Sequence, residues 1–351
     1  MRVAPPEVQA TWPSPNYIDP ETRGPALLIV QLITFPIALL CLALRLYVRL
    51  VIMRKSGWDD WLMVAATMFG TGLTVCVMLA SSLFGWDVHV WDLTAEDIVS
   101  GRRVSFIAQC LFVPSTALAK VSILVSYLRL APLDSWFRRL THVALCFVTL
   151  TNTAFFLVLF TQCIPTSSYW DLLGSSRDCI PEGPPLVSHA VGTLVADFIV
   201  WILPLPSLYH ARLPLSQRLA LIVLFSFGLF VVVAACVRTY WVHYVVEETY
   251  DVTWNGFQLW IWTAVEVHLG VICGCVPLLK SLFNLWKNKC ANVASPAAGA
   301  EGRRRTDART VWDRGAVLRM NSVVKCSNAA KEQYMDLESC GDLSGPTTRP
   351  G

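Results

Sequence analysis

Charged residues are scarce in this chain of 351 residues: Asp, Glu, Lys and Arg make up 15% of it, whereas 54% is hydrophobic. In a soluble protein, about a quarter of the residues are usually charged. The scarcity therefore argues against an ordinary soluble domain and predicts a polytopic membrane protein. The formal net charge is only +3 and the cations form no stripe or basic domain, so we expect no nucleic-acid binding.

Motifs for several enzyme and cofactor classes are absent as well. The sequence contains no Walker, Rossmann or EF-hand motif and no repeat with a period of roughly 20–50 residues. Its histidines show neither HxxxH nor HExxH spacing, which are typical of zinc hydrolases. We therefore expect no metal site and no enzymatic activity.

Long apolar runs are what the sequence has instead. Seven of them are long enough to cross a hydrocarbon layer, which needs about 20 helical residues. Because runs of this length without alternating polarity cannot be barrel strands, the sequence predicts an all-α bundle of seven transmembrane helices. The first 24 residues lack the pattern of a secretory signal peptide, so we expect the first run to direct insertion. The expected helices cover 26–47, 61–83, 104–127, 142–162, 186–208, 218–240 and 257–283.

The distribution of Lys and Arg predicts the orientation. Cations gather at the junctions on one side of the expected bundle, whereas acids gather on the other side, and the cation-rich side of a membrane protein is cytosolic. We therefore expect an extracellular amino-terminal segment (1–24), a membrane domain (25–285) and a disordered cytosolic tail (286–351). We also expect the plasma membrane rather than an internal membrane. The cations are Arg45, Arg49, Arg54, Lys55, Arg129, Arg138, Arg139, Arg212, Arg218, Lys280, Lys287 and Lys289.

The stretch between the first two spans is predicted to be a cytosolic loop, with Arg45 and Arg49 at its start and Asp59 and Asp60 at its end. Ser56 and Asp59 have the spacing of a capping box for the second helix. Two interpretations of this stretch stay open. It is either a capped helix flanked by cations that bind lipid headgroups, or a docking loop for a cytosolic signalling partner.

Three ionisable residues fall within the expected spans, where a charge is costly unless it is paired or hydrated. Lys120 and Asp197 lie at depths that differ by roughly 7 Å at a rise of 1.5 Å per residue, which a lysine side chain can bridge. They are candidates for an intramembrane ion pair that acts as a switch. The alternative is that Lys120 reaches to the interface while Asp197 bonds a neighbouring helix.

The third residue, Glu266, lies among aromatic residues in the outer half of the seventh span. Its neighbours in the sequence are Trp260, Trp262 and His268, and together they are candidates for a small-molecule pocket. Trp260 and Trp262 are two residues apart, so they cannot face the same way on a helix. Plain helix packing is the alternative interpretation.

A disulfide is expected in the loop between the fourth and fifth spans, which is predicted to face an oxidising compartment. Cys163 and Cys179 lie in this loop, and Cys110 lies near the same side in the third span. Spacing does not determine the connectivity. We favour the Cys163–Cys179 pairing, with Cys110 as an alternative partner.

Several segments together resemble the fungal rhodopsin-domain integral membrane proteins over roughly residues 25–285. They are GWDDWLMVAA after RLYVR, FGWDVHVWDL, LAKVSILVSYLRL, DFIVWILPLP, FGLFVVVAACVR and LWIWTAVEVHLGVICGCVPLLKSLF. The family includes receptor-like sensors and members in secondary-metabolite gene clusters, such as that for satratoxin. The resemblance marks as recurrent positions Asp59, Asp60, Lys120, Arg129, Cys163, Cys179, Asp197, Pro204, Arg238, Glu266 and Pro277.

The resemblance implies a multi-pass fungal protein that is receptor-like and senses a small molecule, with a link to secondary metabolism. A transporter or an auxiliary membrane protein of a metabolite pathway is the alternative. Light sensing would need a lysine deep in the seventh span to form a retinal Schiff base, and the lysine there, Lys280, lies at the cytosolic end. We therefore expect no cofactor.

Overall fold

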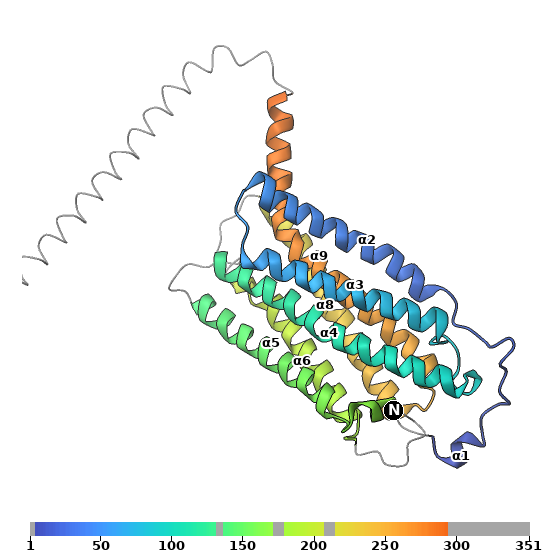
Figure 1. The fold of residues 1–351 in the computed structure, drawn as a ribbon. Coiled ribbons are helices and arrows are strands. Elements are labelled where there is room, and N and C mark those ends of the chain that lie inside the picture. The colour runs from blue at the N-terminus through green and yellow to red at the C-terminus, as the bar shows by residue number, and fades with distance from the viewer. Residues whose placement is uncertain (1–3, 131–135, 171–178, 207–214, 294–351) are drawn as a thin grey trace, which may run out of the picture. The chain divides into compact units, whose positions relative to one another are not determined.

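The computed structural model describes residues 4–130, 136–170, 179–206 and 215–293. Within these ranges the fold is all-α, and seven helices are long and apolar enough to cross a membrane, as the sequence predicted (Figure 1). A short helix, α1 (Pro6–Gln9), precedes them. The seven are α2 (Ala26–Tyr47), α3 (Trp58–Leu83), α4 (Ala95–Leu130), α5 (Trp136–Thr161), α6 (Gly183–Ile202), α8 (Leu215–His243) and α9 (Val252–Val293).

The helices begin at or before the expected residues because polar residues also form helical turns, but α6 ends at Ile202 rather than at residue 208. α4 begins at Ala95 rather than near residue 104, and the hydroxyl of Thr94 accepts a hydrogen bond from the Asp97 N–H at its start. One π-helix (Val48–Ile52) continues α2 and another (Tyr244–Glu248) continues α8. α9 passes the expected domain end at residue 285 and reaches Val293. The rest of the predicted tail, and the Lys280 side chain, lie outside what the structure describes.

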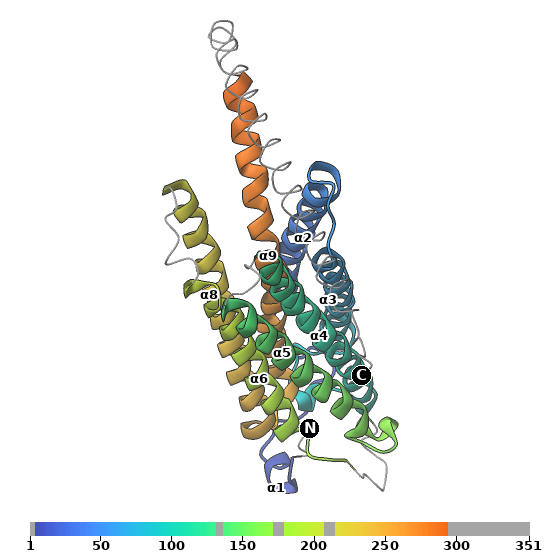
Figure 2. The ribbon, with the colours of Figure 1, turned by 90° about the vertical axis from the view of Figure 1, so that its left-hand side faces the viewer.

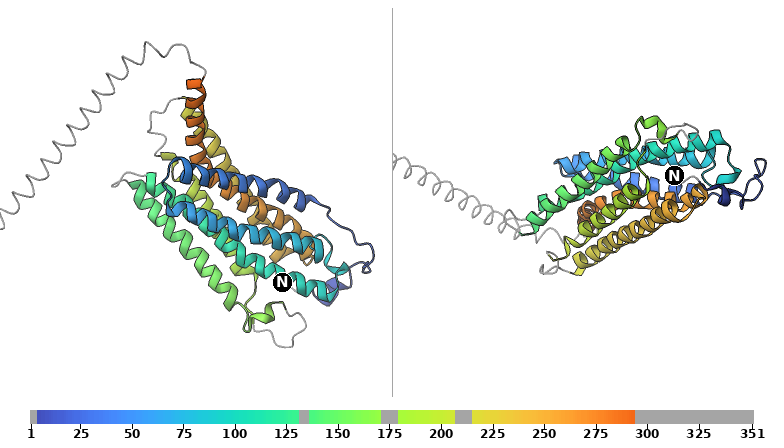
Figure 3. Two further views of the ribbon diagram at one scale, coloured as in Figure 1. Left: turned by 45° about the horizontal axis from the view of Figure 1, so that its top comes forward. Right: turned by 90° about the horizontal axis from the view of Figure 1, so that it is seen from below.

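Consecutive helices lie side by side: α2 packs on α3, α3 on α4, α4 on α5 and α5 on α6, while α6 packs on α8 (Figure 2). The views in Figure 3 show the same neighbours. We name the two ends of the bundle by their residues. The disulfide end holds the connections 84–94 and 249–251 and the described parts of the α5–α6 connection, 162–170 and 179–182, and the Arg45 end holds the connection between α2 and α3.

A disulfide joins Cys163 and Cys179 in the connection between α5 and α6. Cys110 is a free thiol in α4, so the alternative pairing is wrong. Cys163 is buried and packs in the same apolar cluster as Tyr169, and the Ile180 N–H donates to the Gln162 carbonyl beside it. The bond therefore fixes a connection that also contributes to the core.

Removing this disulfide is expected to destabilise the protein by about 3 kcal/mol, because a closed loop of this size restricts the unfolded chain. The variant is Cys163→Ala with Cys179→Ala, and the measurement is the thermal unfolding midpoint of the purified protein with and without reductant. Cys110→Ala is the control and should cost less. Free thiols at both positions in non-reduced peptides would contradict the prediction.

Candidate functional site

A cavity of about 480 Å³ opens between the helices at the disulfide end. This volume is within the range of small-molecule sites, roughly 300–1,000 Å³. Its walls come from the α3–α4 connection, α4, α5, α6, α8 and α9, and they are mainly apolar. Large aromatic side chains contribute much of this surface: Trp86, Phe112, Phe155, Tyr169 and Trp260.

Part of the cavity wall is an ion pair that links α4 to the loop before α6. Arg102 Nη2 lies 2.7 Å from Glu182 Oε1 and donates to the Tyr169 carbonyl at 2.6 Å. Arg102 was not predicted from the sequence, because the expected helix began at residue 104, whereas α4 begins at Ala95. Burial raises the pKa of the Tyr169 hydroxyl, and the nearby Glu182 charge raises it further. The phenol therefore stays neutral, and it accepts a hydrogen bond from Gln109 Nε2 at 3.3 Å.

A second ion pair lies between α8 and α9. Arg238 Nε is 2.5 Å from Glu266 Oε2, and the two residues are 4% and 3% exposed. The Arg238 guanidinium carbon lies 4.8 Å from the centre of the Phe112 ring. Its Nη2 has no hydrogen-bond partner among the described residues, although Arg238 lines the cavity. The sequence marked Arg238 as a recurrent position of the resemblance but not as an intramembrane charge, and the helical segment continues beyond the expected end at residue 240 to Glu248.

A histidine also lines the cavity. His189 of α6 stacks on Phe155 with ring centres 3.9 Å apart, and its Nε2 lies 3.2 Å from Asn152 Oδ1. In the sequence, His189 is a lone histidine within an apolar run, and nothing else there indicated that it lies at a cavity. The contact joins α5 to α6 beside the cavity.

The residues expected to form the ligand pocket are only partly brought together. Trp260 lines the cavity, and its indole Nε1 has no partner among the described residues. Glu266 does not line the cavity but contacts Arg238, which does. Trp262 is partly buried and does not line the cavity either. His268 faces other helices, with its two ring nitrogens 2.7 and 3.1 Å from the hydroxyls of a threonine in α2 and one in α3. Ligand binding by these residues stays a prediction.

The structure places Lys120 of α4 beside Asp197 of α6, with Lys120 Nζ 3.0 Å from Asp197 Oδ2. The same nitrogen donates to the Thr193 carbonyl at 3.2 Å, and both charged side chains are 7% exposed. Lys120 is therefore held in the bundle rather than extended to an interface. A switching role for the pair stays a prediction.

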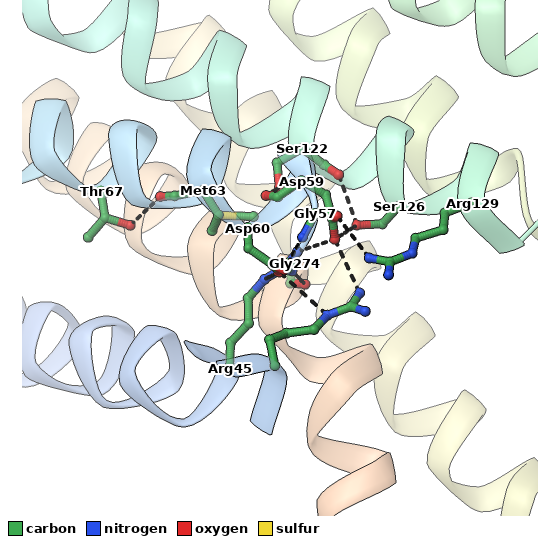
Figure 4. Close-up of polar contacts among 11 residues, drawn as sticks. Arg45, Gly57, Asp59, Asp60, Met63, Thr67, Ser122, Ser126, Arg129 and Gly274 are labelled. Carbon is green, nitrogen blue, oxygen red and sulfur yellow. Dashed lines mark hydrogen bonds and ion pairs between the residues drawn. The ribbon is translucent and has the colours of Figure 1, made fainter. Parts of the chain in front are cut away.

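At the opposite end, Arg45 joins three helices (Figure 4). Its Nη2 is 2.8 Å from Asp59 Oδ2 and its Nε is 2.9 Å from Asp60 Oδ1, both in the first turn of α3. Its Nη1 donates to the Gly274 carbonyl of α9 at 2.6 Å. Arg45, Asp59 and Asp60 are each 1% exposed, so this is a fully buried ionic cluster.

Two further arginines complete this cluster. Arg49 Nη2 lies 3.2 Å from Asp59 Oδ2, and Arg129 of α4 lies 3.4 Å from Asp59 Oδ1. The arginines of the basic stretch thus bury the two acids that follow it in the sequence. Binding of headgroups or of a partner by this stretch stays a prediction.

The expected capping box is also displaced by one residue. The helix N-cap is Gly57 rather than Ser56, and the Gly57 N–H donates to Asp60 Oδ2 at 3.1 Å. A side chain at Gly57 would run into the Asp59 carboxylate and the Arg129 guanidinium. Asp60 makes both kinds of contact, because its Oδ1 lies 2.9 Å from Arg45 Nε while its Oδ2 caps the helix.

Comparison with known proteins shows which proteins this chain is similar to. A sequence model of the fungal rhodopsin domain matches residues 44–285. The chain is similar to a SAT4 family membrane protein of Emericella nidulans, with 22% identity over 264 residues, 74% of this chain and 63% of the relative. It is 26% identical over 262 residues to Wortmanamides biosynthesis cluster protein C of Talaromyces wortmannii, 73% of this chain and 69% of that protein.

A third relative carries a receptor name. Receptor GIN3 of Arthrobotrys oligospora is 21% identical over 286 residues, which are 76% of this chain and 67% of the relative. The matched part thus spans about two thirds of the length of each of these three relatives. The family match includes the residues that line the cavity and those of the Arg45 cluster. With its seven membrane-spanning helices, this chain belongs to the fungal rhodopsin domain family of multi-pass membrane proteins.

Proposed function

We propose that this protein is a receptor that senses a small molecule in the cavity at the disulfide end. The observation that carries the proposal is the cavity itself, whose volume and apolar walls with few polar groups are typical of small-molecule sites. In this proposal the amino terminus and the disulfide end are outside the cell, in the plasma membrane, and the protein is not an enzyme. The relative named a receptor supports this class of function.

α9 offers a route from the cavity to the Arg45 end. Trp260 of α9 lines the cavity, and the Gly274 carbonyl on the same helix accepts from Arg45. The two positions are about 21 Å apart along the helix at 1.5 Å per residue. If α9 can take two placements in the bundle, a ligand that binds more tightly to one of them increases the population of that placement. The contacts of α9 at the Arg45 end then change with it. A cytosolic signalling partner would respond to this shift.

Filling the cavity is expected to abolish the response. Val242 is 3% exposed and lines the cavity, so Val242→Phe places a ring in the ligand volume. We expect the response of fungal cells to an activating metabolite extract, measured by a G-protein or cyclic-AMP reporter, to lose at least about tenfold in sensitivity, the equivalent of about 1.4 kcal/mol.

The matched control for this experiment is Val233→Phe, because Val233 lies on the same helix and is 45% exposed, away from the cavity. The control should respond as the wild type does when both variants are present in equal amounts. An unchanged response of Val242→Phe would rule out this cavity as the sensing site.

A transporter or auxiliary protein of a metabolite pathway is the second candidate. The Lys120–Asp197 and Arg238–Glu266 pairs favour it, since ionisable groups inside a membrane often mark a substrate path. A relative named as a biosynthesis cluster protein also supports it. Deletion of the gene separates the two candidates. Reduced metabolite export without any loss of signalling would favour the transporter.

A further inference from the structure

Three polar side-chain groups of residues that line the cavity lack hydrogen-bond partners within the described part of the chain. One is the Thr253 hydroxyl, which can donate or accept, and the other two, Arg238 Nη2 on α8 and Trp260 Nε1 on α9, can only donate. Arg238 is 4% exposed and Trp260 is 7% exposed, and both residues line the cavity. A buried donor without a partner is costly and is usually satisfied by an acceptor from water or a ligand. Both nitrogens are themselves buried while their residues line the cavity, so an acceptor inside the cavity reaches them when the side chain turns toward it.

The charges around these donors decide which kind of acceptor fits. Arg238 is paired with Glu266, and Arg102 with Glu182, so each arginine that lines the cavity already has a carboxylate. Asp97 and Glu247 add further acids to the lining. Nearby, Lys120 and Asp197 also form a pair. An anionic ligand would thus bring an unpaired charge into a mainly apolar cavity, which is strongly unfavourable.

We propose that the ligand is a neutral, largely apolar molecule with a carbonyl-type oxygen that accepts hydrogen bonds from Arg238 Nη2 and Trp260 Nε1. This inference rests on the proposed function, because it names the class of molecule that the cavity takes. The aromatic walls formed by Trp86, Phe112 and Phe155 contact the apolar part of the ligand. The contacts of Arg238 with Glu266 and with the Phe112 ring hold the guanidinium beside the cavity.

Three matched probes test this class on the full chain, purified and reconstituted in lipid nanodiscs. Methyl decanoate presents a neutral carbonyl, decanoate at about pH 8 presents a carboxylate, and undecane presents neither. Affinity is measured from the concentration-dependent rise of the unfolding midpoint. We expect methyl decanoate to bind about tenfold more tightly than either of the other probes. Tighter binding of decanoate, or no binding of any probe, would overturn the ligand class.

Trp260→Phe tests one donor, because it removes the indole N–H and keeps an aromatic ring. We expect it to weaken methyl decanoate binding about fivefold to tenfold and to leave undecane binding unchanged. Trp262→Phe is the matched control, two residues away and outside the cavity lining, and it should bind methyl decanoate as the wild type does. Equal loss in both variants, or no loss in Trp260→Phe, would overturn the assignment of this donor.

Arg238→Lys tests the other donor with a residue that keeps a positive charge for Glu266 but has a different donor geometry. This variant should weaken the binding of methyl decanoate by a similar factor. Unchanged binding in the folded variant would overturn the role of Arg238 as a donor.

These results are independent of the cell experiment. If Val242→Phe abolishes signalling while the carboxylate binds better, the proposed function stands and the ligand class falls. If Val242→Phe leaves signalling unchanged, the proposed function itself falls.

Discussion

Asp59→Asn is expected to lower the free energy of unfolding by about 3–5 kcal/mol, the usual cost of breaking a buried ion pair from one side. The Asp59 carboxylate accepts from Arg45, Arg49 and Arg129, so the change leaves these cations with one buried carboxylate, that of Asp60. The amide has nearly the same shape, so the loss reports charge rather than packing. Such a loss is a large part of the total stability of a typical protein, about 5–15 kcal/mol.

Glu96→Gln is the matched control, because Glu96 is also an acid in the first turn of a helix but is exposed. Both changes remove a favourable charge from a positive helix end, worth about 0.3–1 kcal/mol. The measurement is the midpoint of thermal or denaturant unfolding of the purified proteins, together with the yield of monodisperse protein. Similar midpoints for the two variants would show that the Arg45 cluster contributes little beyond helix capping.

Glu266→Gln is the second change with a large expected effect, again about 3–5 kcal/mol, since it leaves the Arg238 guanidinium buried without a counter-charge. Arg238 has contact with the Phe112 ring, but a ring face stabilises a cation far less than a carboxylate does. The unfolding midpoint of the purified protein again measures the effect.

A double variant separates the pair from its surroundings. Arg238→Gln combined with Glu266→Gln removes both charges and should recover most of the stability that Glu266→Gln loses. Glu248→Gln is the control, because it makes the same change at an exposed glutamate whose contact with His243 is 3.6 Å long. That surface contact should be worth less than about 1 kcal/mol. A double variant that is less stable than Glu266→Gln would contradict the expected charge effect.

The sequence predicted the helices well because membrane insertion depends on the length of an apolar run, which a single chain displays directly. The proximity of Lys120 and Asp197 followed from the same logic. Both residues lie in spans that run in the same direction, so counting residues gave their depths to within the reach of a lysine side chain. Depth along the membrane is thus readable from sequence.

The length of an apolar run does not show which side chains of a helix face which neighbours. It also does not show the polar turns that extend a helix at its ends. Trp260 lines the cavity whereas His268 bonds α2 and α3, because eight residues of helix turn these side chains toward different neighbours. Arg45 and Arg238 lay near the ends of their expected spans and Arg102 lay just before the expected span 104–127, because charge was used to mark the end of each span. In the structure each of these arginines is buried beside an acid from another segment, which hydropathy alone does not show.

The Arg45 contacts also impose an order on biosynthesis. Arg45 acquires Asp59 and Asp60 within 14 and 15 residues of further synthesis, but the Gly274 carbonyl follows 229 residues later. At roughly 5–20 residues per second, that interval is roughly 11–46 s. During this time the ribosome holds a nascent chain whose Arg45 Nη1 lacks its final acceptor. A chain truncated before α9 therefore keeps Arg45 Nη1 of α2 without this acceptor.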